Sequence, residues 1–127
     1  MSTTYDISLE PLHAGLETID AGALADGCPV PWWNRTLCQA NDTYVRLGVF
    51  LGTFHWHHHD TEDEVFFVLE GLLLLDIRDA DGSERTVELG PRQAMLVPHG
   101  VVHRTRAEER TVVLMVEPAT VVPTGDG

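Results

Sequence analysis

The sequence has few basic side chains. Only 8 of its 127 residues are Lys or Arg, against 20 Asp and Glu, which gives a formal net charge of -12. A field of this sign repels nucleic acid phosphates and anionic lipid headgroups, so it argues against binding that is driven by counterion release. We interpret the charge as an acidic surface that keeps the protein soluble, and we expect no nucleic acid partner.

The sequence also lacks long apolar runs and cysteine pairs with the spacing of a zinc site or a redox motif. No stretch approaches the roughly 20 residues of a membrane span, and the N-terminus lacks the basic-then-apolar order of a secretion signal. We therefore expect a cytoplasmic protein without a membrane partner. The two cysteines, Cys28 and Cys38, match no zinc or redox spacing. In a reducing compartment they are expected to be two thiols without a disulfide.

Helical periodicity is the third feature that is lacking. The best helical run, L-E-G-L-L-L-L, contains Gly71 and has β-branched and aromatic neighbours, which favour strands. Residues 1–31 are rich in Ala, Gly, Asp and Pro and show no sustained period. We interpret them as an extended or partly ordered arm that could add one edge strand.

From Trp32 onward, short β-rich runs alternate with turn residues. Starts roughly 8 to 12 residues apart, with Gly, Pro and Asp between them, predict an all-β sandwich or barrel. The length suits one domain, which we place at residues 32–127. The expected strands are residues 44–51, 54–59, 64–70, 72–78, 84–89, 93–97, 101–105 and 110–117.

The segment F-H-W-H-H-H-D-T-E-D-E, residues 54–64, concentrates four histidines and four acids. Side chains on a strand alternate between its two faces, so an H-x-H pair can hold one ion from the same side. This rule places His55, His57 and His59 on one face and His58 on the other. Parity alone leaves the pairs 55/57 and 57/59 open.

The residues that follow favour the later pair. Glu64 opens the apolar strand E-V-F-F-V-L-E, where a carboxylate is costly to bury unless it is paired or metal-bound. The resulting spacing is H-x-H-x4-E-x6-G. A further histidine, His103, follows the tight turn in P-H-G-V-V-H and enters an apolar strand. His57, His59, Glu64 and His103 are thus the candidate ligands, with His55 as a supporting neighbour or an alternative ligand.

Other polar and aromatic residues receive simpler interpretations. His13, His58, His99 and the D-T-E-D turn are expected at the surface. Trp32 and Trp33 are expected to pack in the core, or else to line a pocket entrance. Several apolar strand residues are candidates first for the core and second for pocket walls: Phe66, Val68, Met95, Val97, Val113 and Met115.

These motifs carry a family resemblance. W-H-H-H-D-T-E-D-E-V-F-F-V-L-E-G followed by V-P-H-G-V-V-H resembles the two conserved motifs of the cupin superfamily, and small cupins resemble the chain from about Trp32 to Asp126. The ending E-P-A-T-V-V-P-T-G-D resembles the tail of a bacterial subgroup often labelled phosphomannose-isomerase-like. The resemblance implies a double-stranded β-helix, or jelly-roll barrel, which is usually a homodimer. It also implies one divalent metal bound by His57, His59, Glu64 and His103.

Nitrogen and carboxylate ligands without thiolate suit Fe, Mn, Ni, Co, Cu or Zn. Four protein ligands leave a coordination position open, which favours a catalytic over a structural ion. We therefore expect an enzyme that acts on a small organic chelating substrate, as a dioxygenase first and an isomerase or cyclase second. The alternatives are a non-catalytic metal or small-molecule binding cupin and a barrel with a vestigial site. A phosphosugar would require Arg or Lys in the pocket, whereas the few bases lie mostly in turns and strand ends.

Overall fold

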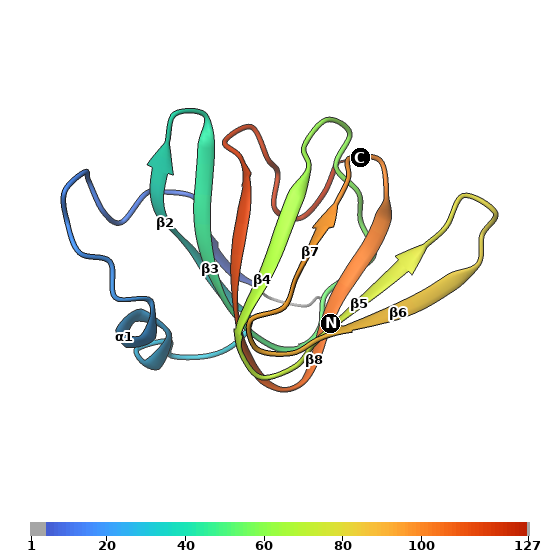
Figure 1. The fold of residues 1–127 in the computed structure, drawn as a ribbon, viewed down its shortest axis with the longest axis horizontal. Coiled ribbons are helices and arrows are strands. Elements are labelled where there is room, and N and C mark those ends of the chain that lie inside the picture. The colour runs from blue at the N-terminus through green and yellow to red at the C-terminus, as the bar shows by residue number, and fades with distance from the viewer. Residues whose placement is uncertain (1–4, 127) are drawn as a thin grey trace.

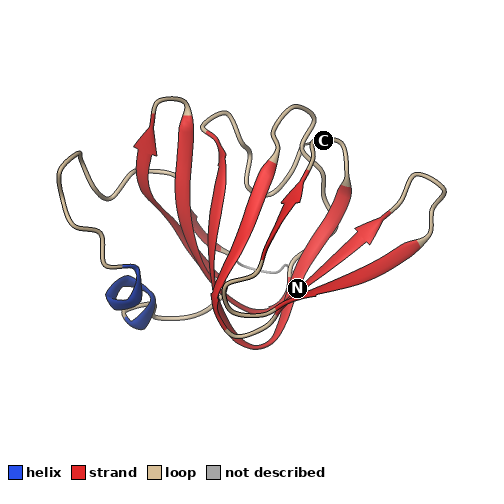
Figure 2. Ribbon diagram, viewed as in Figure 1, coloured by secondary structure: helices blue, strands red, loops and turns tan. Residues whose placement is uncertain are grey.

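The computed structural model describes residues 5–126, and strands dominate it (Figure 2). In chain order the elements are β1 (Asp6–Ser8), α1 (Ala21–Asp26), β2 (Trp33–Ala40), β3 (Thr43–Thr53), β4 (Glu64–Glu70), β5 (Leu73–Arg78), β6 (Glu84–Leu89), β7 (Ala94–Val97) and β8 (Val102–Pro118). The predicted all-β class is confirmed. Within the described residues, no helix has both the length and the apolar character to cross a membrane.

Strand β8 organises the sheet. Its first half pairs with β5, and its second half pairs with β3 on one side and β4 on the other. The outer strands then extend the sheet in the order β1-β2-β3-β8-β4-β7, while β6 pairs with β5. In Figure 1 the β5–β6 hairpin diverges from the other strands. The topology is that of a jelly-roll barrel.

Two apolar clusters lie on opposite faces of the strands. The inner cluster is largely aromatic and contains Trp32, Phe50, Phe54 and Phe66. The outer cluster packs α1 and its neighbours onto β2 and β3 through residues that include Ala25, Trp33, Leu37, Leu47 and Val49. The neighbouring tryptophans therefore point to opposite faces, as strand alternation requires. The six apolar core candidates all lie in the inner cluster or pack against it.

Several strand predictions were wrong in detail. Residues 54–59 form no strand, because only His57 pairs there, in an isolated bridge with His103. The expected strands 101–105 and 110–117 are one continuous strand, β8. Strand β2 was not among the predicted runs, although half of its side chains are buried. Polar residues such as Asn34, Thr36 and Gln39 interrupt the apolar pattern by which the strand could have been predicted. The helix through Gly71 is absent, as expected, since β4 ends at Glu70 and β5 begins at Leu73.

The N-terminal arm is partly ordered. Strand β1 adds to the sheet edge by pairing in parallel with β2, which confirms the edge strand. The arm also contains α1, which has only six residues and was too short for its period to be detected. Its first turn is capped by Asp20, whose side chain accepts a hydrogen bond from the Ala23 amide at 2.9 Å. The division of the chain at residue 32 stays a prediction. Both cysteines are free thiols.

Candidate metal centre

The structure brings the four predicted ligands together at one end of the barrel. One donor atom from each of His57, His59, Glu64 and His103 lies within 4.8 Å of all the others. The Oε1 atom of Glu64 is 3.7 Å from Nε2 of His59 and 3.5 Å from Nε2 of His103. Ligand atoms that bind one ion at about 2.1 Å lie roughly 3 to 4 Å apart, so these spacings suit a single transition-metal ion.

Three different elements supply these side chains. Glu64 is the first residue of β4 and faces inward, while His103 lies near the start of β8. The bridge between His57 and His103 consists of two backbone hydrogen bonds of 2.9 Å, which place the two rings 4.3 Å apart. The guanidinium carbons of Arg78 and Arg104 lie over the ring of the intervening Trp56, 4.4 and 4.6 Å from its centre. This outward anchor helps to turn His57 inward although no strand forms.

Backbone carbonyls fix the orientation of two of the rings. The Nδ1 atom of His57 lies 2.9 Å from the carbonyl oxygen of His55, and Nδ1 of His103 lies 2.9 Å from that of Val101. Because a carbonyl only accepts, each Nδ1 must carry the proton and donate it. The lone pair of each ring is therefore on Nε2, which faces the cluster. Carbonyl partners of this kind are typical of metal-binding histidines.

Burial keeps the imidazoles neutral. Desolvation is the main cause that lowers the pKa of His57, to about 3, and it also lowers the pKa values of His59 and His103. Neutral imidazole is the form that binds a metal. Both ring nitrogens of His59, Oε1 of Glu64 and Nε2 of His103 are buried without a hydrogen-bond partner in the described part of the chain. Unpartnered buried polar atoms are costly, and a cation would satisfy these donor atoms together.

Sequence reasoning missed two charged residues behind the cluster. Glu117 and Arg46 are 2% and 1% exposed, and Nη1 of Arg46 lies 3.5 Å from Oε1 of Glu117. Burial, with the nearby charge of Glu64, raises the pKa of Glu117 well above its ordinary value. Arg46 interrupts the apolar run Y-V-R-L-G-V-F-L at an inward-facing position, which was the one available signal. The expectation that the bases lie in turns and strand ends is therefore wrong for Arg46.

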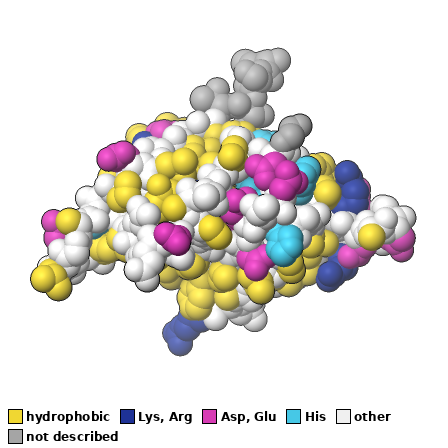
Figure 3. All heavy atoms as spheres, turned by 90° about the horizontal axis from the view of Figure 1, so that it is seen from above, with side chains coloured by type: hydrophobic (Ala, Val, Ile, Leu, Met, Phe, Trp, Pro, Cys, Tyr) yellow, Lys and Arg dark blue, Asp and Glu magenta, His cyan; other side chains and the backbone are white. Residues whose placement is uncertain are grey.

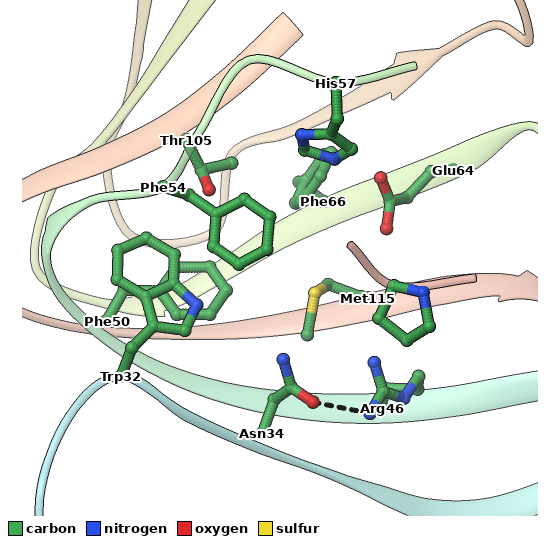
Figure 4. A pocket seen from close by; sticks show the side chains of 11 residues that line it. Trp32, Asn34, Arg46, Phe50, Phe54, His57, Glu64, Phe66, Thr105 and Met115 are labelled. Atoms are coloured by element: carbon green, nitrogen blue, oxygen red, sulfur yellow. Dashed lines mark hydrogen bonds between the residues drawn. The ribbon is translucent and has the colours of Figure 1, made fainter. Parts of the chain in front are cut away.

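A cavity next to the cluster combines an aromatic wall with a polar end (Figure 4). Trp32 stacks on Phe50 with ring centres 4.2 Å apart, and Phe54 and Phe66 continue the wall. Trp32 thus both packs in the core and lines the pocket. The cavity encloses about 320 Å³ when its mouth is included, but only a small part of this space is wide enough for a water molecule. It has room for one or two water molecules as it stands.

Arg46 and Asn34 form the polar end of the cavity. Nη2 of Arg46 donates to Oδ1 of Asn34, and Nε of Arg46 donates to Thr36 at 3.1 Å. The bond to Oδ1 fixes the orientation of the Asn34 amide. Its Nδ2 therefore points toward the cavity, as Figure 4 shows. A hydrogen-bond donor thus faces the aromatic wall and the candidate ligands.

His55 lies beside the four-residue cluster. Its Nδ1 lies 3.2 Å from the Tyr5 hydroxyl and its Nε2 lies 2.6 Å from the carbonyl oxygen of Thr124, so both ring nitrogens already have partners. Its own carbonyl accepts from His57. This geometry favours a supporting role over that of an alternative ligand.

The remaining polar residues follow the expectation, with one exception. His99 is exposed and lies near Asp63, while His58 and His13 are half-buried and lie near Asp60 and Glu17, respectively. Figure 3, in which the molecule is seen from above, shows His and acidic side chains side by side on that face. Glu62, by contrast, is only 6% exposed, because Thr61 and Thr120 donate to its Oε2. The expectation that Glu62 lies in a solvated turn is therefore wrong.

Comparison with known proteins gives a consistent result. A family model described as "Cupin domain" matches residues 51–117, which include all four candidate ligands. The protein YdbB of Bacillus subtilis is 48% identical over 84 residues, which cover 66% of this chain and 71% of YdbB. The crystal structure of a cupin-2 domain containing protein from Shewanella frigidimarina is similar with a TM-score of 0.71 and 30% identity. That match covers 79% of this chain and 93% of the Shewanella chain.

A relative with a named activity matches more distantly. An acireductone dioxygenase of Bacillus velezensis is 28% identical over 114 residues, or 89% of this chain. The match covers 64% of that enzyme, so the chain spans somewhat less than two thirds of its length.

Proposed function

Because this chain belongs to the cupin family, we propose that it is a metal-dependent enzyme with one divalent ion bound by His57, His59, Glu64 and His103. The observation that carries the proposal is the buried group of ligand atoms without hydrogen-bond partners among the described residues. Four protein ligands leave a position open on a five- or six-coordinate ion. An open position favours catalysis over a structural role.

We assign dioxygenase chemistry as the leading reaction, with isomerase or cyclase chemistry second. Support comes from the similarity to an acireductone dioxygenase over 89% of this chain. When bound, a redox-active ion would supply electrons to dioxygen and Lewis acidity to a chelating pair of substrate oxygens. The metal remains one of Fe, Mn, Ni, Co, Cu or Zn.

The protein's own residues would bind and orient the substrate. The aromatic wall favours a small, flat molecule, and Nδ2 of Asn34 would donate to an oxygen of that molecule. Arg46 contributes positive charge at the same end. The substrate that fits best is thus a small organic molecule with an oxygen pair at the metal and a further acceptor oxygen. Since the cavity now admits only water, substrate entry requires the residues at its mouth to move.

Metal analysis tests the site. We expect one metal ion per chain in the wild type and none in the double variant His57→Ala/His103→Ala, because two of the four ligands are lost. His99→Ala, which removes an exposed histidine, is the matched control and should keep the metal. Equal metal content in the wild type and the double variant would refute the site.

Oxygen uptake tests the reaction. The metal-loaded protein is offered a panel of 1,2-diketones, 1,3-diketones and catechols, and dioxygen consumption is measured with the double variant as background. We expect uptake with at least one member of the panel. A wild type that binds metal and chelators without consuming oxygen or changing them would support the alternative, a non-catalytic binding cupin. The narrow cavity is the observation that favours this alternative.

The assembly and location of the protein stay predictions. The outer face of β4 and β7 exposes Phe67 by 38% and Leu96 by 55%, an apolar surface that suits the homodimer that the family resemblance implies. Light scattering at several concentrations measures the mass in solution. Three other expectations also stay predictions: a cytoplasmic location, a small-molecule partner and the lack of a nucleic acid partner.

A further inference from the structure

The C-terminal tail, which we define as residues 119–126, has contacts that the four candidate ligands do not explain. It follows the end of β8 and lies along the histidine loop, defined here as residues 54–63. The amide of Asp126 donates to the carbonyl of His58 at 2.8 Å, and Oδ2 of Asp126 accepts from the amide of Asp60 at 2.7 Å. The carbonyl of Thr124 lies 2.6 Å from the ring of His55. The tail therefore holds the loop at three successive points.

Two further contacts bring the tail against Glu62 and the candidate ligand His57. Thr120 donates to Oε2 of Glu62 at 2.7 Å, which keeps this carboxylate turned inward. Gly125 has a φ of 94°, and a Cβ atom at this position would lie 2.5 Å from Cβ of His57. Only glycine accommodates both the positive φ and this close approach. The sequence T-G-D at the end of the tail is thus matched to the position of His57.

His59 differs from the other two histidines in its surroundings. His57 and His103 each donate from Nδ1 to a backbone carbonyl, whereas neither nitrogen of His59 has a hydrogen-bond partner within residues 5–126. A ring nitrogen of His59 lies within 4.8 Å of carboxylate oxygens of Glu62 and Asp126.

We propose that the C-terminal tail orients the histidine loop for metal binding, and that Asp126 is the positioning residue, whose second carboxylate oxygen faces Nδ1 of His59. The proposal rests on the proposed metal site. Nε2 of His59 faces Glu64, which leaves Nδ1 for the side of Asp126. Oε2 of Glu62 already accepts from two threonines, whereas only Oδ2 of Asp126 is occupied, so Oδ1 is available.

The tail substitutes for the missing strand. Residues 54–59 have a single β-bridge, so regular sheet pairing does not fix their side chains. The tail supplies the hydrogen bonds that a neighbouring strand would otherwise supply. Partners that fix the ring orientation of a metal-binding histidine are typically worth 10- to 100-fold in metal affinity.

Zinc affinity of the full chain, measured by competition with a chromophoric chelator, tests the proposal. We expect Asp126→Asn to weaken zinc binding by about 10-fold, because the amide keeps an acceptor for Asp60 but loses the charge beside His59. Asp126→Ala should weaken it by up to about 100-fold. Asp26→Asn is the matched control, because it removes the same charge from a side chain that is 80% exposed at the end of α1. Its zinc affinity should equal that of the wild type.

A second readout separates positioning from a general effect on folding. In the zinc-loaded protein, the Nδ1 proton of His59 should be visible by nitrogen-resolved NMR and exchange slowly with water. It should exchange faster in Asp126→Asn, while the Nδ1 proton of His103 should not change. If Asp126→Ala fails to fold, Asp126→Asn decides the question.

The outcomes are distinct. Wild-type zinc affinity and wild-type His59 exchange in the Asp126 variants would overturn the role of the tail and leave the metal site intact. A wild-type chain that binds no zinc would overturn the proposed metal site itself, and the positioning role with it.

Discussion

The substitution Glu64→Gln is expected to stabilise the metal-free protein while it abolishes metal binding. Glu64 is 5% exposed and lies close to Glu117, and burial raises the pKa of both carboxyls. Oε1 of Glu64 has no hydrogen-bond partner among the described residues. The cost of such a buried unpaired group is about 1 to 3 kcal/mol. The amide has the same shape without the charge, so we expect a gain of about 1 to 2 kcal/mol.

Thermal melting with and without metal measures both effects. In the presence of a chelator, the variant should melt roughly 3 to 8 °C above the wild type. With zinc at 100 times its dissociation constant, the wild type should gain about 2.7 kcal/mol, whereas the variant should gain almost nothing. The order of the two melting temperatures should therefore reverse. Glu70→Gln is the matched control, because it removes the same charge from the exposed end of β4.

Two results would refute this reasoning. A Glu64→Gln variant that melts below the wild type in chelator would show that the carboxylate stabilises the metal-free fold. A variant that gains as much stability from zinc as the wild type would show that Glu64 is not a ligand.

Three further predictions concern the fold around the site. Gly71→Ala should lower the free energy of unfolding in urea by about 1 to 3 kcal/mol, because Gly71 has a φ of 88° and an added Cβ would lie 2.8 Å from the carbonyl oxygen of Arg110; wild-type stability would contradict the close contact. Arg46→Met should cost roughly 3 to 5 kcal/mol in the same assay, since it leaves Glu117 buried without a cation, and a cost under about 1 kcal/mol would contradict that pairing. Burial alone would raise the pKa of Asp76, but hydrogen bonds from two arginines and a threonine hold it well below its ordinary value. The stability from Asp76 is therefore present above about pH 4 and is lost as the pH falls through the depressed pKa. Melting temperature against pH should show a shallower acid limb for Asp76→Asn, and an unchanged limb would contradict this assignment.

The sequence predicted which candidate ligands lie together better than it predicted the secondary structure around them. Glu64 could be identified as unusual because a carboxylate at the head of an apolar strand is a local conflict that a metal resolves. His57 and His59 followed from their spacing to it. The strand predicted for them does not form, and His57 still lies beside His59 and Glu64 because a single bridge pairs it with His103.

Other parts of the site could not be predicted. Arg46 and Glu117 lie in different strands, β3 and β8, and each would be too costly to bury without the other nearby. The role of Asp126 depends on where the tail contacts the histidine loop. The periodicity of the sequence does not indicate this contact. The same holds for β2, whose polar inward residues Asn34 and Thr36 are buried because Arg46 hydrogen-bonds them.

The sequence by itself determined the all-β class, the turns and the set of candidate ligands, because alternation, turn chemistry and residue spacing are local properties. Only the tertiary structure decided which charged residues lie behind the cluster, how His55 and His59 differ, and that the tail lies against the histidine loop. The physical reason is that the cost of burying a polar group depends on its partners, and here those partners come from segments far apart in the chain.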